Sequence, residues 1–274
     1  MDCELTDSGL EIVYWTSLGV FVLSVVVSLV LWFYVYFKSI LVRPKQLLKG
    51  HYDKTYYGCP KRLDEKDLSH AEDVHIDSLL VENRCFLSFD ALSRSTIIFF
   101  LQIVLYATFL MGQGTVYSDE LSICIPWARW AVYSVSCSLL AYEIAIFQKM
   151  VPYVRNVFTF LITATLLTGL FTTLSVSSEI NRFVWYGIGF VFYIPALLLL
   201  FLLSDPFDKL KGAVGWYIPI FVLITWTFYP IIFILTPALF DVISLSLAGW
   251  LYLASDLLTK VFFSFWISYL EARY

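Results

Sequence analysis

The chain has 274 residues, of which 59% are hydrophobic and 19% aromatic, and its formal net charge is −4. A composition this apolar is typical of a membrane protein and excludes an ordinary water-soluble domain. The sequence contains no nucleophile–base pair, phosphate-binding loop or metal-ligand spacing, so it does not favour an enzyme or a metal site. Nothing in it indicates nucleic-acid binding.

Seven apolar segments are long enough to cross about 30 Å of hydrocarbon as helices. Before the first, the stretch MDCELTDSGLE is acidic, which predicts a retained helix rather than a cleaved signal peptide. The sequence therefore predicts an all-α membrane protein, a seven-transmembrane-helix bundle forming one domain over residues 1–274, with a long connection at about 38–94. The predicted spans are 12–37, 92–112, 124–147, 153–175, 183–204, 214–236 and 243–269.

Basic residues gather on one side of the predicted membrane. Fifteen of the 18 Lys and Arg residues fall in the first, third and fifth connections or near the C-terminus, whereas the opposite side has Arg182. Since Lys and Arg mark cytoplasmic loops, we expect a multi-pass plasma-membrane protein with its N-terminus outside and its C-terminus cytoplasmic. The connection at 38–94 would face the anionic inner leaflet or a partner, although its mixed charges are also typical of a solvated surface. Outside, Cys3 and Cys124 are compatible with a disulfide within or between chains, or with two free thiols.

The last span contains a lysine, Lys260, in the middle of an otherwise apolar stretch. A charge at that depth costs about 2.5–3.5 kcal/mol on insertion scales, so it indicates a function. Asp256 lies four residues earlier and shares a helix face with Lys260. Two interpretations are open: a structural ion pair between helices, or a Schiff base formed with an aldehyde, with the carboxylate as counter-ion.

Span six places Trp226, Tyr229 and Phe233 on one helix face, with a kink expected at Pro230. Such aromatic residues usually face lipid or pack against other helices. Together with a buried lysine, however, they favour a slot for a flat, conjugated ligand.

Four motifs in the expected spans and order resemble the microbial (type 1) rhodopsin family over nearly the whole chain. They are the D-x-x-x-K pattern ending at Lys260, the W-x-x-Y-P pattern beginning at Trp226, the R-F-V-W-Y sequence beginning at Arg182, and Arg129 in span three. This resemblance implies all-trans retinal bound covalently to Lys260, Asp256 as counter-ion, and photoisomerisation as the trigger. It further implies a retinal pocket formed by Trp130, Tyr133, Ser136, Cys137, Leu140, Tyr186, Gly189, Tyr193, Trp226, Tyr229 and Phe233.

Span three indicates the kind of rhodopsin. Three residues after the family arginine, proton pumps have an aspartate that accepts the Schiff-base proton, and chloride pumps have a hydroxyl or amide; this chain has Val132. An isopropyl group can do neither task, which argues against an outward proton pump. Asp256 is then the single close counter-ion, and we expect it to keep the Schiff base protonated.

A second resemblance, to channelrhodopsins, lies in Ser136-Cys137-Ser138, which takes the place of their T-C-P triplet. Anion-conducting channelrhodopsins often lack a carboxylate at the position of Val132 and retain the one at Asp256, as here. Span two lacks the glutamates that line cation-conducting algal channels, although it also lacks the glutamate common there in many anion channels. This resemblance implies a light-gated channel that passes chloride or other small anions passively, in a homo-oligomer such as a dimer or trimer. The expected ion path or gate comprises Gln102, Arg129, Val132 and Glu143.

Several features depart from that pattern. Tyr133 replaces the tryptophan expected after the arginine, Ser138 replaces the proline, and the run R-W-x-x-Y-S-x-S also resembles heliorhodopsins, which have the inverted orientation. Glu143 occupies the proton-donor place of the pumps and could gate, reprotonate the Schiff base, or snorkel to the interface. A non-transporting sensory or heliorhodopsin-like photoreceptor and a cation or proton channel are the alternatives.

Overall fold

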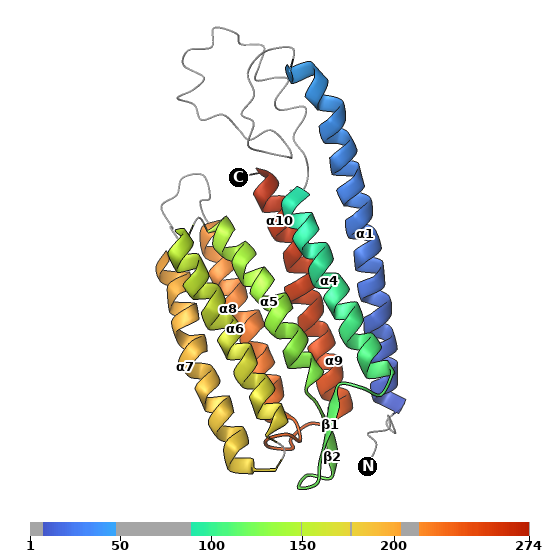
Figure 1. Cartoon of the computed structure of the whole chain (residues 1–274), viewed down its shortest axis with the longest axis vertical. Helices are drawn as coiled ribbons and strands as arrows, with labels where there is room; N and C mark the ends of the chain where they lie inside the picture. Colours follow the sequence, from blue (N-terminus) through green and yellow to red (C-terminus); the bar gives the residue numbers. More distant parts are fainter. Residues whose placement is uncertain (1–7, 48–88, 149, 176, 204–213, 274) are drawn as a thin grey trace.

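The computed structural model describes residues 8–47, 89–148, 150–175, 177–203 and 214–273, and it contains the predicted bundle of seven helices (Figure 1). Six helices are continuous: α1 (Ser8–Leu47), α4 (Phe89–Leu110), α5 (Ala128–Phe147), α6 (Pro152–Leu174), α7 (Glu179–Leu203) and α8 (Val214–Leu235). The seventh consists of α9 (Leu245–Asp256), a π-helical turn η1 (Leu257–Phe262) and α10 (Phe263–Arg273).

Six of the described helices are individually long and apolar enough to cross a membrane. The seventh helix runs through residues 245–273, but its α-helical pieces are shorter because η1 divides them. A π-helical turn inside an α-helix often marks a functional site, and this one contains Lys260.

Two ends of the predicted first connection were wrong. Helix α1 continues to Leu47, and α4 already begins at Phe89. Arg94, which was counted with the basic residues of the connection although the predicted span began at 92, lies in the helix. Hydropathy detects the part of a helix that suits hydrocarbon, whereas a helix can continue in water beyond that part. The remaining residues, 48–88, lie outside the described part of the chain.

An antiparallel hairpin, β1 (Thr115–Ser118) and β2 (Ile123–Pro126), was not predicted. Residues 124–127, expected at the start of span three, therefore precede α5. The sequence ICIP is apolar enough to resemble a span, but Ser122, with φ of 53°, turns the chain back so that Ile123 pairs with Ser118. Cys124 is disulfide-bonded, whereas the expectation for Cys3 falls outside the described residues.

The hairpin and the first residues of α1 lie at one end of the bundle, here called the hairpin end, and α10 finishes at the opposite end (Figure 1). Helix α5 lies inside the bundle, where it packs against α4, α6 and α10. Its close approach to α6 depends on Gly169, because a Cβ there would come within 2.7 Å of the Trp130 ring. This arrangement places the middle of α5 opposite the seventh helix.

Candidate functional site

Lys260 and Asp256 form an ion pair in the middle of the seventh helix. They are one turn apart, and the Lys260 ammonium donates a hydrogen bond to Asp256 Oδ1. Both side chains are fully buried. Burial of two charges is tolerable only because they are paired and hydrogen-bonded, so the remaining acceptor positions of Asp256 need donors as well.

Three tyrosines supply those donors. The hydroxyls of Tyr106 on α4 and Tyr133 on α5 each donate to Asp256 Oδ2 at 2.8 Å, and Tyr229 on α8 donates to Oδ1 at 2.8 Å. The carboxylate thus ties four helices together. Tyr106 was not among the predicted site residues, and its only sequence signal is that it follows Gln102 by four residues in the same span.

Arg129 lies next to this cluster but reaches the carboxylate through the phenols. Its Nη1 donates to Tyr133 Oη at 3.0 Å and to Tyr106 Oη at 3.5 Å, whereas its distance to Asp256 Oδ2 is 4.0 Å. The guanidinium also stacks over the ring of Tyr252 at 4.4 Å. Its buried Nε has no hydrogen-bond partner among the described residues.

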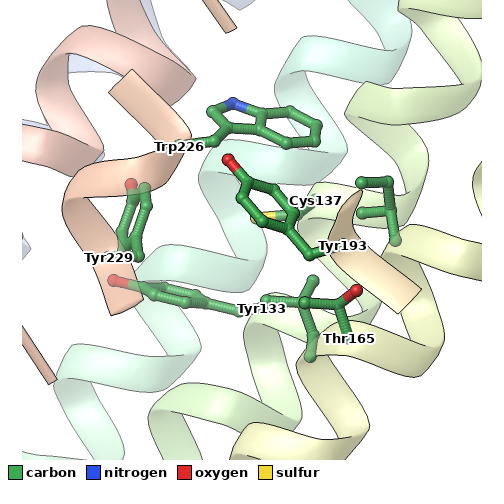
Figure 2. A pocket seen from close by; sticks show the side chains of 8 residues that line it. Tyr133, Cys137, Thr165, Tyr193, Trp226 and Tyr229 are labelled. Atoms are coloured by element: carbon green, nitrogen blue, oxygen red, sulfur yellow. The ribbon is translucent and has the colours of Figure 1, made fainter. Parts of the chain in front are cut away.

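A cavity lies beside two of these phenols, Tyr133 and Tyr229. Figure 2 shows that aromatic side chains from three helices, Tyr133, Tyr193, Trp226 and Tyr229, surround it. Its lining is completed by Cys137, Ile162, Thr165 and Leu166. Lys260 is adjacent, since its Nζ lies 3.8 Å from the centroid of the Tyr133 ring.

Five of the predicted pocket residues line this cavity: Tyr133, Cys137, Tyr193, Trp226 and Tyr229. The α6 wall of the cavity, formed by Ile162, Thr165 and Leu166, was not predicted as part of the pocket. No motif marks which face of that threonine-rich helix points inward. The other six are not among the described residues that line the cavity: Trp130, Ser136, Leu140, Tyr186, Gly189 and Phe233.

Several of these six side chains contact other residues instead of the cavity. Trp130 packs edge-on against Phe233, with ring centroids 4.9 Å apart, and Tyr186 donates a hydrogen bond to the Pro230 carbonyl at 3.0 Å. Gly189 lies against Thr168, which a Cβ would approach to 2.8 Å. Leu140 is fully buried in the core.

The predicted ion-path residues do not form one cluster. Gln102 Nε2 donates to Ser136 Oγ at 3.2 Å, and both side chains are fully buried. Val132 is partly buried against the core. Glu143 lies toward the opposite end from the hairpin, fully buried, with Oε1 3.6 Å from Arg94 Nη2. This burial contradicts the interpretation that Glu143 snorkels to the interface.

The buried Lys260 amine and the aromatic cavity beside it suit retinal. A seven-helix membrane bundle with a buried amine, a paired carboxylate and an aromatic cavity beside them defines the class of retinal-binding membrane proteins. Residues 90–273 match the model of the bacteriorhodopsin-like protein family, and the chain belongs to this family. Its members bind retinal through a lysine Schiff base, and this protein is therefore a retinal protein.

Known relatives include ion pumps. The chain is 22% identical over 147 residues to halorhodopsin of Halobacterium sp. (strain SG1), a match covering 52% of this chain and 51% of the relative, so the match spans about half the length of that curated protein. The fold resembles that of halorhodopsin, a light-driven chloride pump, with 14% identity, a TM-score of 0.71 and coverage of 97% and 96%. It also resembles the light-driven proton pump of Coccomyxa subellipsoidea, with 18% identity, a TM-score of 0.68 and coverage of 96% and 97%.

Proposed function

We propose that the protein is a light-gated channel that conducts chloride and other small anions passively. In this proposal Lys260 forms the Schiff base and Asp256 is its counter-ion. The carrying observation is the buried charge: Lys260 and Arg129 contribute two positive charges beside the single carboxylate of Asp256, so these three residues carry a net charge of +1. In a low-dielectric interior such an excess attracts an anion.

Retinal, when bound, supplies the absorption of light and a change of shape at the Lys260 end of the cavity. The residues of the chain perform the other tasks. Asp256 stabilises the positive charge on Lys260, and Tyr229, held by Thr259 at 2.7 Å, orients the carboxylate. The aromatic walls exclude water from the cavity.

The buried polar groups suit an anion better than a cation. The two fully buried carboxylates of the described residues, Asp256 and Glu143, each lie beside a cation, Lys260 and Arg94 respectively. Unpaired acids, which would attract cations, are therefore not a feature of the described core. Arg129 has an Nε–H donor without a hydrogen-bond partner among the described residues, and an anion can accept a hydrogen bond from it.

Val132 supports passive flow. Besides the counter-ion, outward proton pumps have an aspartate at this position that accepts the Schiff-base proton, and the side chain of Val132 cannot accept a proton. We further propose that the hairpin end is extracellular, as the distribution of basic residues indicates, and that the exposed apolar helix faces contact lipid and a second or third copy of the chain.

Whole-cell voltage clamp with retinal and a light flash tests this function. External chloride is exchanged for a large impermeant anion, and the reversal potential is measured before and after. A reversal potential that follows chloride is expected. One that follows sodium or pH instead would contradict the proposal, and a light-responsive protein without current would favour the sensory alternative.

A light-driven chloride pump is the second candidate, favoured by the similarity to halorhodopsin. The same recording separates the two. A pump drives current in one direction with equal chloride on both sides and at zero voltage, whereas a channel then carries no net current.

A further inference from the structure

Tyr133 contacts every charged group of the site and the cavity as well. Its fully buried hydroxyl donates to Asp256 Oδ2 at 2.8 Å and accepts from Arg129 Nη1 at 3.0 Å. Its ring lies under Lys260 Nζ, 3.8 Å from the centroid, packs edge-on against Tyr229, and forms a wall of the cavity. One side chain thus connects the ligand cavity, the lysine, the carboxylate and the arginine.

The other two phenols each have only part of this set. Tyr106 contacts Asp256 and Arg129 but is not among the described residues that line the cavity. Tyr229 contacts Lys260, Asp256 and the cavity, and the described contacts do not join it to Arg129. Within the described part of the chain, Tyr133 is therefore the direct route from the cavity to Arg129.

We propose that Tyr133 is a positioning residue that transmits a light-driven displacement of Lys260 to Arg129 and so controls the hairpin end of the anion path. The last step rests on the proposed function; the coupling itself does not. A cation held over an aromatic face is attracted by it, so movement of the charge on Lys260 off the ring releases the phenol. Arg129 Nη1 is 4.0 Å from the carboxylate, too far for a hydrogen bond, and its hydrogen bonds to described side chains go to phenol oxygens. A movement of these oxygens therefore changes how the guanidinium is held.

Light-induced infrared difference spectroscopy on the full chain with retinal in lipid vesicles tests the coupling. With isotope-labelled arginine, the guanidinium band that disappears in Arg129→Gln reports on Arg129. Tyr133→Phe keeps the ring and removes the hydroxyl that bonds to Arg129. We expect the light-induced band to fall about fivefold, since the loss of one ordinary hydrogen bond lowers the fraction of Arg129 held by this side chain by about that factor. Tyr106→Phe removes a phenol from the same carboxylate oxygen and should leave roughly half of the band or more, because its contact with Arg129 is the longer one.

An unchanged band in Tyr133→Phe, or equal losses in both variants, would overturn the inference, since a shared structural role at Asp256 would then explain both. If Tyr133→Phe fails to assemble with retinal, Tyr133→Trp replaces it, because this variant keeps an aromatic face without the phenol. We expect the same loss of the Arg129 band in Tyr133→Trp. An unchanged band in this variant would likewise overturn the inference. A normal Arg129 response in the unmodified protein without chloride current would refute the proposed function and leave the coupling intact.

Discussion

Arg94 on α4 and Glu143 on α5 form an ion pair at the end of the bundle opposite the hairpin, with 3.6 Å between Nη2 and Oε1. Glu143 is fully buried, whereas the Arg94 side chain retains 23% of its exposure. Removing a carboxylate from water costs several kcal/mol, which a neighbouring cation partly offsets. The pair therefore fastens α4 to α5 on the side of the cavity away from Arg129.

A double-mutant cycle with Arg94→Met and Glu143→Gln measures this fastening. We expect a coupling free energy of about 1–3 kcal/mol, so the double variant is less destabilised than the two single variants predict together. The measurement is the free energy of unfolding in detergent micelles, followed by absorption of the bound chromophore. Arg94→Met combined with Glu120→Gln, at the hairpin end, is the control and should be additive. Additivity in the Arg94–Glu143 cycle would show that the pair contributes no specific stability.

Neutralising Asp256 changes the absorption spectrum. Asp256→Asn removes the negative charge closest to Lys260 while Arg129 remains, so the charged form of the Schiff base loses its stabilisation. We expect the visible absorption band to decrease and a near-ultraviolet band to replace it. A high chloride concentration should restore part of the visible band, because an anion can substitute for the missing carboxylate.

The matched control for this spectrum is Asp241→Asn. Asp241 is exposed in the connection between α8 and α9, and its φ of 52° suits asparagine. Its substitution should leave the visible band unchanged. If Asp256→Asn also retains the original spectrum, another group is the counter-ion.

Arg129 is the residue on which anion selectivity should depend. Arg129→Gln removes the excess positive charge of the buried cluster, and even a loss of 1.4 kcal/mol of anion stabilisation lowers occupancy about tenfold. We expect the chloride photocurrent to fall by at least that factor of about ten. Arg155→Gln is the control, because Arg155 stacks on Tyr142 near the opposite end of the bundle. Equal currents in the original protein and Arg129→Gln would place the anion path elsewhere.

The sequence predicted those parts of the fold and site that depend on local spacing. Hydropathy alone locates seven helices, and the four-residue separation of Asp256 and Lys260 puts them on one face before any tertiary information. Tyr106 could not be found in this way, because it is 150 residues from Asp256 and meets it only after α4 packs beside the seventh helix. The ion pair of Arg94 with Glu143 was not predicted for a similar reason, because it forms only when α4 and α5 pack together.

The α6 wall of the cavity shows the same limit. Ile162, Thr165 and Leu166 line it because of the rotation of α6 about its axis, and at that rotation Gly169 lies against the Trp130 ring with no room for a Cβ. A glycine in a transmembrane segment is ordinary, and its sequence neighbours do not show which helix it will contact. The pocket residues could therefore be predicted where family motifs mark them, but not where helix packing alone decides which residues line the cavity.

The contact between Gly169 and Trp130 can be tested directly. A Cβ on Gly169 would lie 2.7, 2.9 and 3.1 Å from three atoms of the Trp130 ring, which cannot yield easily because the ring is buried against Phe233. Gly169→Ala should therefore push α6 from α5 and destabilise the protein by about 1–3 kcal/mol, the usual cost of overpacking. The same substitution at Gly187, an exposed helix position with no atom within 4 Å, should instead be neutral or stabilise by up to about 1 kcal/mol, because alanine favours the helix. Thermal unfolding of both variants with retinal bound measures the difference.

Because α6 also forms the cavity wall, Gly169→Ala should shift the absorption maximum while Gly187→Ala should not. Equal stability of the two variants would mean that α6 and Trp130 adjust freely, and the rotation of α6 would then not be set by this contact.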